Sequence, residues 1–155
     1  MRIVLEGCDG TGKTTLANEL ASIYKLDICH CTQHDPSDYL FYQQTLRKEN
    51  IVWDRHTIGE LIYPKIFNRE QKTTEEQALS IVDYGKSIGV KFLVLTADDE
   101  VIKNRLDSRG GENQTILDNI NFINSEFVSY AYRFNIPVID TSKMTISQIL
   151  NIINY

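Results

Sequence analysis

The sequence predicts an α/β fold in which a five-stranded parallel sheet carries helices on both faces, giving three layers, α/β/α. Two observations support this expectation. Short apolar runs with strand character alternate along the chain with longer segments of helical periodicity, and such alternation is typical of a parallel sheet. A glycine-rich segment also lies directly between the first apolar run and the first helical pattern.

Five segments are predicted as strands because they are rich in β-branched and other apolar residues. They are residues 2–6, about 28–31, 51–54, 92–95 and 136–140. Helices are predicted where apolar residues recur at helical spacing. They are residues 14–24, roughly 37–48, 74–88, 98–108, 115–133 and 145–153. Ligands of such sheets bind beyond the carboxyl ends of the strands, so the ends of the first and third strands are expected to supply the chemistry.

Length and charge limit the possible functions. The 155 residues fit a single domain, 1–155, without repeats or low-complexity segments. The net charge is −5, with acidic and basic residues interspersed, which argues against a nucleic-acid polymer or a membrane surface as partner. No apolar run has the length of a membrane span, and the N-terminus runs straight into the first strand, so a cytoplasmic protein is expected.

Three cysteines, at positions 8, 29 and 31, are expected to be reduced thiols, because the chain shows no secretion signal. Cys29 and Cys31 lie close to His30 and His34, which raises the question of a zinc site. The spacing is not C-x-x-C, and no fourth ligand is evident. A half-buried strand end is therefore the favoured interpretation.

Residues 7–15 match the phosphate-binding motif G-x-x-x-x-G-K-[ST]. Backbone N–H groups of such a loop form an anion-binding nest at a helix N-terminus. Lys13 would reach the β and γ phosphates, and the Thr14 hydroxyl is the expected ligand of Mg²⁺. The predicted phosphate-binding residues are Gly7, Asp9, Gly10, Thr11, Gly12, Lys13, Thr14 and Thr15. The motif predicts a P-loop NTPase with ATP and Mg²⁺ bound.

Asp54 and Arg55 follow the apolar residues of the third predicted strand. An aspartate in this place is the usual second carboxylate of a phosphate-loop enzyme, which holds the metal directly or through water. In the alternative interpretation, Asp54 caps the segment that begins at Thr57 and Arg55 pairs with a surface carboxylate.

The chain resembles the thymidylate kinases, and more broadly the kinases of deoxynucleoside monophosphates. Residues 6–15 are similar to that family's E-G-x-[DE]-G-x-G-K-T-T loop, with Asp9 at its internal acidic position. The resemblance implies that Asp9 hydrogen-bonds the sugar hydroxyl of the acceptor. Residues 54–56 resemble the family's Asp-Arg-aromatic segment, which implies that Arg55 grips the acceptor's phosphate while Asp54 organises Mg²⁺ and the attacking oxygen.

Residues 101–111 resemble the family's lid, expected here at about 105–114. Gly10 stands where one branch of the family has an arginine, so the resemblance implies that the lid supplies the transition-state arginine, with Arg109 as the candidate. It also implies adenine contacts from Arg105 and Thr141.

Phe41 and Tyr42 resemble the aromatic pair that stacks on the acceptor base. Arg47 lies two residues beyond the position of the family's base-contacting arginine, and Tyr63, with Glu60, falls where related kinases line the acceptor pocket. The short chain is similar to kinases encoded by bacterial viruses, which implies the host cytoplasm if the source is viral. Resemblance also implies a possible homodimer.

The function expected from these residues is transfer of the ATP γ-phosphoryl group to a deoxynucleoside 5′-monophosphate, with dTMP as the leading acceptor. Lys13, Asp9, Asp54, Arg55 and Arg109 would carry the catalysis. One alternative is a deoxynucleoside kinase that acts on the 5′-hydroxyl of, for example, thymidine. Another is a regulator that binds ATP without an acceptor.

Overall fold

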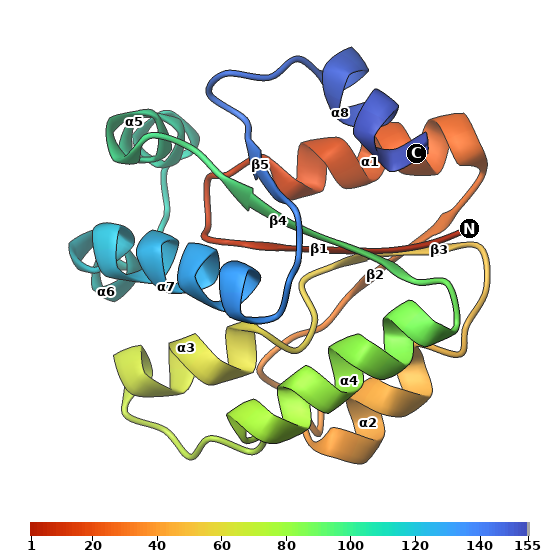
Figure 1. Cartoon of the computed structure of the whole chain (residues 1–155). Helices are drawn as coiled ribbons and strands as arrows, with labels where there is room; N and C mark the ends of the chain where they lie inside the picture. The colour runs from red at the N-terminus through yellow and green to blue at the C-terminus, as the bar shows by residue number, and fades with distance from the viewer. Residues whose placement is uncertain (155) are drawn as a thin grey trace.

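The computed structural model describes residues 1–154 and confirms the predicted α/β fold (Figure 1). Its five strands run parallel in one sheet, in the order β2-β3-β1-β4-β5. The strands are β1 (Arg2–Gly7), β2 (Asp27–His30), β3 (Ile51–Asp54), β4 (Lys91–Thr96) and β5 (Val138–Asp140). The helices are α1 (Lys13–Tyr24), α2 (Tyr39–Thr45), α3 (Gly59–Phe67), α4 (Glu75–Ser87), α5 (Asp99–Arg109), α6 (Gln114–Asp118), α7 (Ile120–Arg133) and α8 (Ile146–Asn154).

Helices cover both faces of the sheet, as expected for parallel strands. Figure 1 shows α1 and α8 on one face and α2, α3, α4 and α7 on the other. Successive side chains of β1 point to opposite faces, because the side-chain period of a strand is two residues. Ile3 and Leu5 therefore pack with α1 and α8, whereas Val4 packs in the opposite core.

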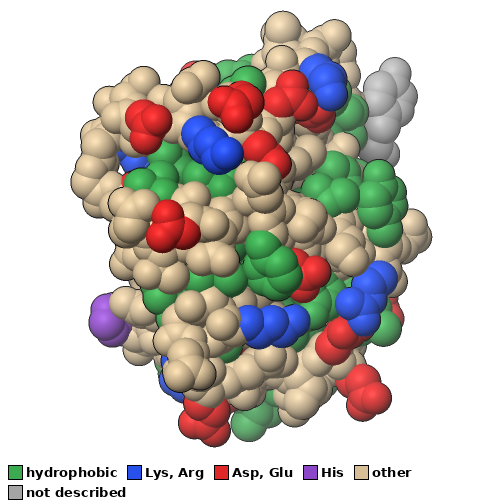
Figure 2. Space-filling model, turned by 90° about the vertical axis from the view of Figure 1, so that its left-hand side faces the viewer, with side chains coloured by type: hydrophobic (Ala, Val, Ile, Leu, Met, Phe, Trp, Pro, Cys, Tyr) green, Lys and Arg blue, Asp and Glu red, His purple; other side chains and the backbone are tan. Residues whose placement is uncertain are grey.

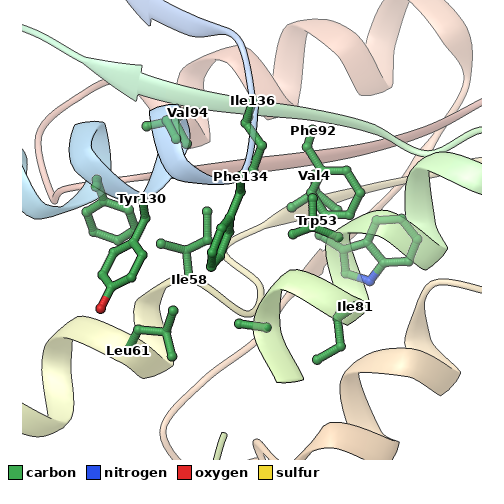
Figure 3. Packing of buried hydrophobic residues seen from close by; sticks show 14 of the residues in the cluster. Val4, Trp53, Ile58, Leu61, Ile81, Phe92, Val94, Tyr130, Phe134 and Ile136 are labelled. Carbon is green, nitrogen blue, oxygen red and sulfur yellow. The ribbon is translucent and has the colours of Figure 1, made fainter. Parts of the chain in front are cut away.

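The larger core lies between the sheet and α3, α4 and α7 (Figure 3). The fully buried Trp53 of β3 and Val4 of β1 meet Ile81 of α4 in this layer. Leu61 of α3 and Tyr130 of α7 extend the same cluster toward the ends of the strands. This packing fixes α3 beside the end of β3, where the candidate site lies.

α3 is a helix that the sequence patterns did not predict. Pro64 lies inside it, and a proline removes one intrahelical hydrogen bond. Leu61 and Ile62 are almost fully buried in the core, and tertiary burial of an apolar face stabilises short helices more than local propensity does. Burial of α3 in the core therefore offsets the unfavourable effect of Pro64 on this helix.

The helix predicted at 115–133 is two helices in the structure, α6 and α7. They meet at Asn119, whose backbone leaves the helical region at φ −118° and ψ 13°. The Asn119 side-chain amide donates to the carbonyl of Thr115 at 2.8 Å. Asparagine side chains compete in this way with the helical hydrogen-bond pattern, which ends α6 here.

All three cysteines are free, and Cys8 and Cys31 are buried. Within residues 1–154, no three His, Cys, Asp or Glu side chains lie close enough together to hold a metal ion by themselves. Cys29 is half-buried and lies within β2, one residue before its end. No helix in this part of the chain has the length and apolar character needed to cross a membrane.

Candidate active site

The phosphate loop connects β1 to α1 at the carboxyl edge of the sheet. Gly7 has φ +141°, and a Cβ at this position would collide with the carbonyl oxygen of Leu95 in the neighbouring strand. Only glycine fits both the dihedral angle and the close approach. The loop can therefore pass directly over β4 and present its backbone N–H groups at the start of α1.

Lys13 is buried within this loop. Its Nζ donates to the carbonyl oxygens of Gly7 and Cys8, each at 2.8 Å. Burial lowers the pKa of Lys13 below its ordinary value, while the charge of Asp54 opposes this shift. An ammonium held only by neutral carbonyls is a ready partner for a phosphate, because an ion pair would replace two hydrogen bonds to neutral groups.

Thr14 and Asp54 meet across the carboxyl edge of the sheet. The Thr14 hydroxyl donates to Asp54 Oδ2 at 2.6 Å, and Asp54 is 4% exposed. His30 Nδ1 lies 3.4 Å from the same carboxylate oxygen. A hydroxyl and a carboxylate are hard oxygen ligands of the kind that Mg²⁺ prefers in nucleotide sites. These two side chains therefore fit a magnesium ion that is also bound by phosphates.

Asp9, Arg55 and Tyr63 converge from three elements of the fold. Arg55 forms an ion pair with Asp9 Oδ1, and the Tyr63 hydroxyl donates to Asp9 Oδ2 at 2.9 Å. The guanidinium carbon of Arg55 also lies 5.6 Å from the centroid of the Tyr63 ring. Arg55 has φ +77°, a strained conformation for a residue with a side chain. With this backbone conformation at the end of β3, the Arg55 guanidinium contacts the phosphate loop through Asp9.

Glu6 braces the turn that carries Arg55. Its carboxylate is buried and accepts a hydrogen bond from the backbone N–H of Ile58 at 2.7 Å. Burial raises the pKa of Glu6 to about 7, and hydrogen bonds from the backbone of Ile58 and His56 oppose this shift. The carboxylate thus links β1 to the segment that begins α3.

A cavity of about 1170 Å³ extends along this edge of the sheet. Figure 2 views the molecule from the side on which the strands end, and acidic, basic and hydrophobic side chains are interspersed over it. The phosphate loop lines the middle of the cavity with Asp9, Gly10, Gly12, Lys13, Thr14 and Thr15. A polar end is lined by Tyr42, His56, Glu60, Tyr63, Phe67 and Arg69. An apolar end is lined by Leu16, Arg105, Thr141, Met144, Ile146 and Ile149.

Glu60 and Arg69 form a paired charge at the polar end, and the sequence patterns did not identify Arg69. The two guanidinium nitrogens of Arg69 lie 3.0 and 2.8 Å from the two oxygens of Glu60. Glu60 is 3% exposed. Arg69 lies two residues beyond the end of α3. Because the sequence patterns did not predict α3, they gave no reason to place Arg69 beside Glu60.

His56 forms part of the same wall and is 2% exposed. Burial lowers the pKa of His56 to about 3, so the ring is neutral at physiological pH. Its Nε2 lies 2.8 Å from the Thr45 hydroxyl, which donates to the carbonyl of Tyr42. The Tyr42 and His56 rings lie 4.9 Å apart at an interplanar angle of 54°, and both are almost fully buried in this wall.

The structure does not bring two of the predicted acceptor-binding residues to the cavity. Phe41 is half-buried and packs against the edge of the larger core, in a helix, α2, that contacts α4. Arg47 is exposed, and its Nε donates to the hydroxyl of Tyr84 at 3.2 Å. Tyr42, the neighbour of Phe41, lines the cavity instead.

The predicted lid residues have different environments. Arg105 donates to the carbonyl oxygen of Gly10 at 3.1 Å and to the Thr141 hydroxyl at 3.0 Å, so α5 is fixed to the phosphate loop. Arg109, at the end of α5, lines the cavity and pairs with Glu112. The predicted lid at 105–114 thus comprises the end of α5 and a short loop before α6.

Comparison with known proteins identifies the fold. No protein-family model and no curated protein sequence matches the chain. Among solved structures, the YorR protein of Bacillus subtilis, in complex with phosphorylated GDP, is 25% identical with a TM-score of 0.83, over 99% of this chain and 94% of that chain. The chain has the fold of the P-loop kinases.

Two enzymes with this P-loop kinase fold are similar at lower identity. A deoxyadenosine kinase from M. mycoides with bound dCTP is 16% identical with a TM-score of 0.64, over 99% of both chains. Thymidylate kinase from Candida albicans is 20% identical with a TM-score of 0.60, over 97% of this chain and 88% of that chain. At these identities the likeness concerns the fold alone.

Proposed function

We propose that this protein is a P-loop kinase that transfers the γ-phosphoryl group of ATP to a deoxynucleoside 5′-monophosphate, with dTMP as the leading acceptor. The convergence of Asp9, Arg55 and Tyr63 beside the phosphate loop carries this proposal. Their cavity, about 1170 Å³ in volume, exceeds the roughly 300–1,000 Å³ of a site for one small ligand. It therefore suits two nucleotides that meet at the phosphate loop.

Positioning and charge neutralisation would supply the catalysis. Phosphoryl transfer passes through a loose transition state in which negative charge is spread over the transferred group. Lys13 would bind the donor phosphates, and Arg55 would bind the acceptor phosphate after leaving Asp9. The carboxylate of Asp9 would then be available to a sugar hydroxyl of the acceptor.

Arg109 is the proposed transition-state arginine. It lies on the cavity wall at the end of α5, where its guanidinium is bound to Glu112. The more negative phosphates of a bound triphosphate would compete with Glu112 for this guanidinium. Closure of the loop after α5 would also exclude water from the transferred group.

Thr14 and Asp54 would hold a magnesium ion. When bound with ATP, Mg²⁺ neutralises charge on the β- and γ-phosphates. Thr14 would supply its hydroxyl oxygen, and Asp54 would bind the metal directly or through water. Asp54 also accepts from Thr14, so the carboxylate orients the hydroxyl.

A deoxynucleoside kinase is the second candidate, because such an enzyme from M. mycoides shares the fold. The ion pair between Arg55 and Asp9 favours a monophosphate acceptor. A guanidinium at this position would make a bidentate interaction with an acceptor phosphate. A nucleoside with a free 5′-hydroxyl offers it no negative charge.

The test is ADP release from Mg-ATP with each deoxynucleoside monophosphate, with GMP and with thymidine. GMP is included because YorR binds a phosphorylated GDP. We expect turnover with dTMP, and Lys13→Met serves as the inactive control. Turnover with another monophosphate would correct the base, and turnover only with thymidine would replace the proposal with the nucleoside kinase. Nucleotide binding without turnover on any acceptor would favour a regulator.

A further inference from the structure

We propose that this site does not select the base of its phosphoryl donor, so that ATP, GTP, CTP and UTP bind with similar affinity. This inference rests on the proposed function, and it concerns the apolar end of the cavity. There the donor base would lie between α1, α8 and the loop that joins β5 to α8. Three observations on this wall support it.

The first observation is the chemical character of the wall. Leu16 of α1 and Ile149 of α8 are each 3% exposed, so they form its packed base. Met144 and Ile146 are half-buried and stand above them. Contact with such side chains depends on apolar area and carries no hydrogen-bond pattern, so it separates purines from pyrimidines only by their difference in size.

The second observation is that the loop from Thr141 to Thr145 has no free backbone donor. The amides of Lys143 and Met144 both donate to the carbonyl of Asp140. The amide of Thr141 donates to Thr96, that of Ser142 to the Asp140 carboxylate, and that of Thr145 to Gln148. This loop cannot offer an N–H group to a base without breaking its own turn.

The third observation is that the polar side chains facing this end are already paired. The guanidinium of Arg105 donates to the carbonyls of Gly10 and Thr141. The Thr141 hydroxyl accepts from Arg105 and lies 2.8 Å from the carbonyl of Thr11, to which it donates. Thr15, the remaining polar side chain here, belongs to the phosphate loop. The Arg105 plane can stack on a base of any identity.

Strong base selection requires protein groups that go unpaired when the wrong base binds. At the apolar end, the backbone amides of residues 141–145 and the polar groups of Arg105 and Thr141 are already engaged within the protein. The polar end differs in character, because the paired side chains of Glu60 and Arg69 lie on its wall. The contacts that the apolar end offers to a base thus depend little on the identity of that base.

Titration of the protein with Mg-ATP, Mg-GTP, Mg-CTP and Mg-UTP by calorimetry, with no acceptor present, tests the inference. We expect four dissociation constants within about 10-fold of one another. A preference of 100-fold or more for one base would overturn it, and so would failure of all four to bind. Similar binding without turnover on any acceptor would sustain the inference while refuting the proposed function.

A matched pair of variants tests the location. Ile146→Ala removes apolar contact area and should weaken all four triphosphates by a similar factor, about 3- to 10-fold. Ile152→Ala removes the same groups from the same helix, but Ile152 is 40% exposed and lies outside this cavity. It should leave all four dissociation constants unchanged. Weakening of one triphosphate alone by Ile146→Ala would overturn the inference.

Discussion

Gly10 joins the phosphate loop to α5, and its replacement by alanine tests that contact. The residue has φ +80°. An added Cβ would lie 3.1 Å from side-chain carbons of both Ile102 and Leu106, and 3.2 Å from the carbonyl oxygen of Ile102. Those two side chains are the buried residues of α5. Gly10→Ala would therefore press directly on the helix that bears Arg105 and Arg109.

The expected cost has two parts. A left-handed backbone costs about 1–2 kcal/mol in a residue with a side chain, and overpacking adds about 1–3 kcal/mol. Gly111→Ala is the matched control, because Gly111 has φ +70° with nothing within 4 Å of an added Cβ. Gly10→Ala should thus unfold with about 1–3 kcal/mol less stability than Gly111→Ala.

Thermal unfolding measures this difference directly. For a domain of this size, 1 kcal/mol shifts Tm by about 2–4 °C, so Gly10→Ala should melt about 2–12 °C below Gly111→Ala. If α5 yields instead of the loop, the affinity for Mg-ATP should fall in Gly10→Ala only. Equal melting temperatures together with equal ATP affinities would refute the proposed contact.

Three further predictions concern the site. Arg55→Ala should lower turnover of the monophosphate acceptor by about 100-fold or more, whereas Arg133→Ala, an exposed arginine paired with Glu75, should leave the steady-state rate unchanged; equal rates for both variants would exclude Arg55. Asp54→Asn should raise the Mg²⁺ concentration for half-maximal activity by about 10-fold or more, and an unaltered magnesium titration would contradict the metal assignment. Glu6 has its pKa raised from 4.5 to about 7 by burial, so its contribution to stability is complete below pH 4.5 and is lost as pH rises through 7. Glu6→Gln should therefore gain about 3 kcal/mol relative to the native protein between pH 4.5 and pH 8, and a constant difference between their denaturant unfolding curves would oppose this.

Local patterns predicted most of the fold. β1 and α1 follow from a short apolar run, a glycine-rich loop and helical spacing in contiguous residues, and both form as expected. Asn119 and Pro64 show the limits of such patterns. Asn119 ends α6 through its own side chain, and α3 forms around Pro64 because the core covers it.

The sequence by itself determined the phosphate loop, because the residues that bind phosphates there are contiguous and their geometry depends on backbone dihedral angles. Only the tertiary structure decided the ends of the cavity. Arg69 pairs with Glu60 from beyond α3, a helix stabilised by burial, and Phe41 packs against the core from α2, which contacts α4. Side-chain direction on a short helix depends on what the helix packs against, and that contact comes from residues far away in the chain.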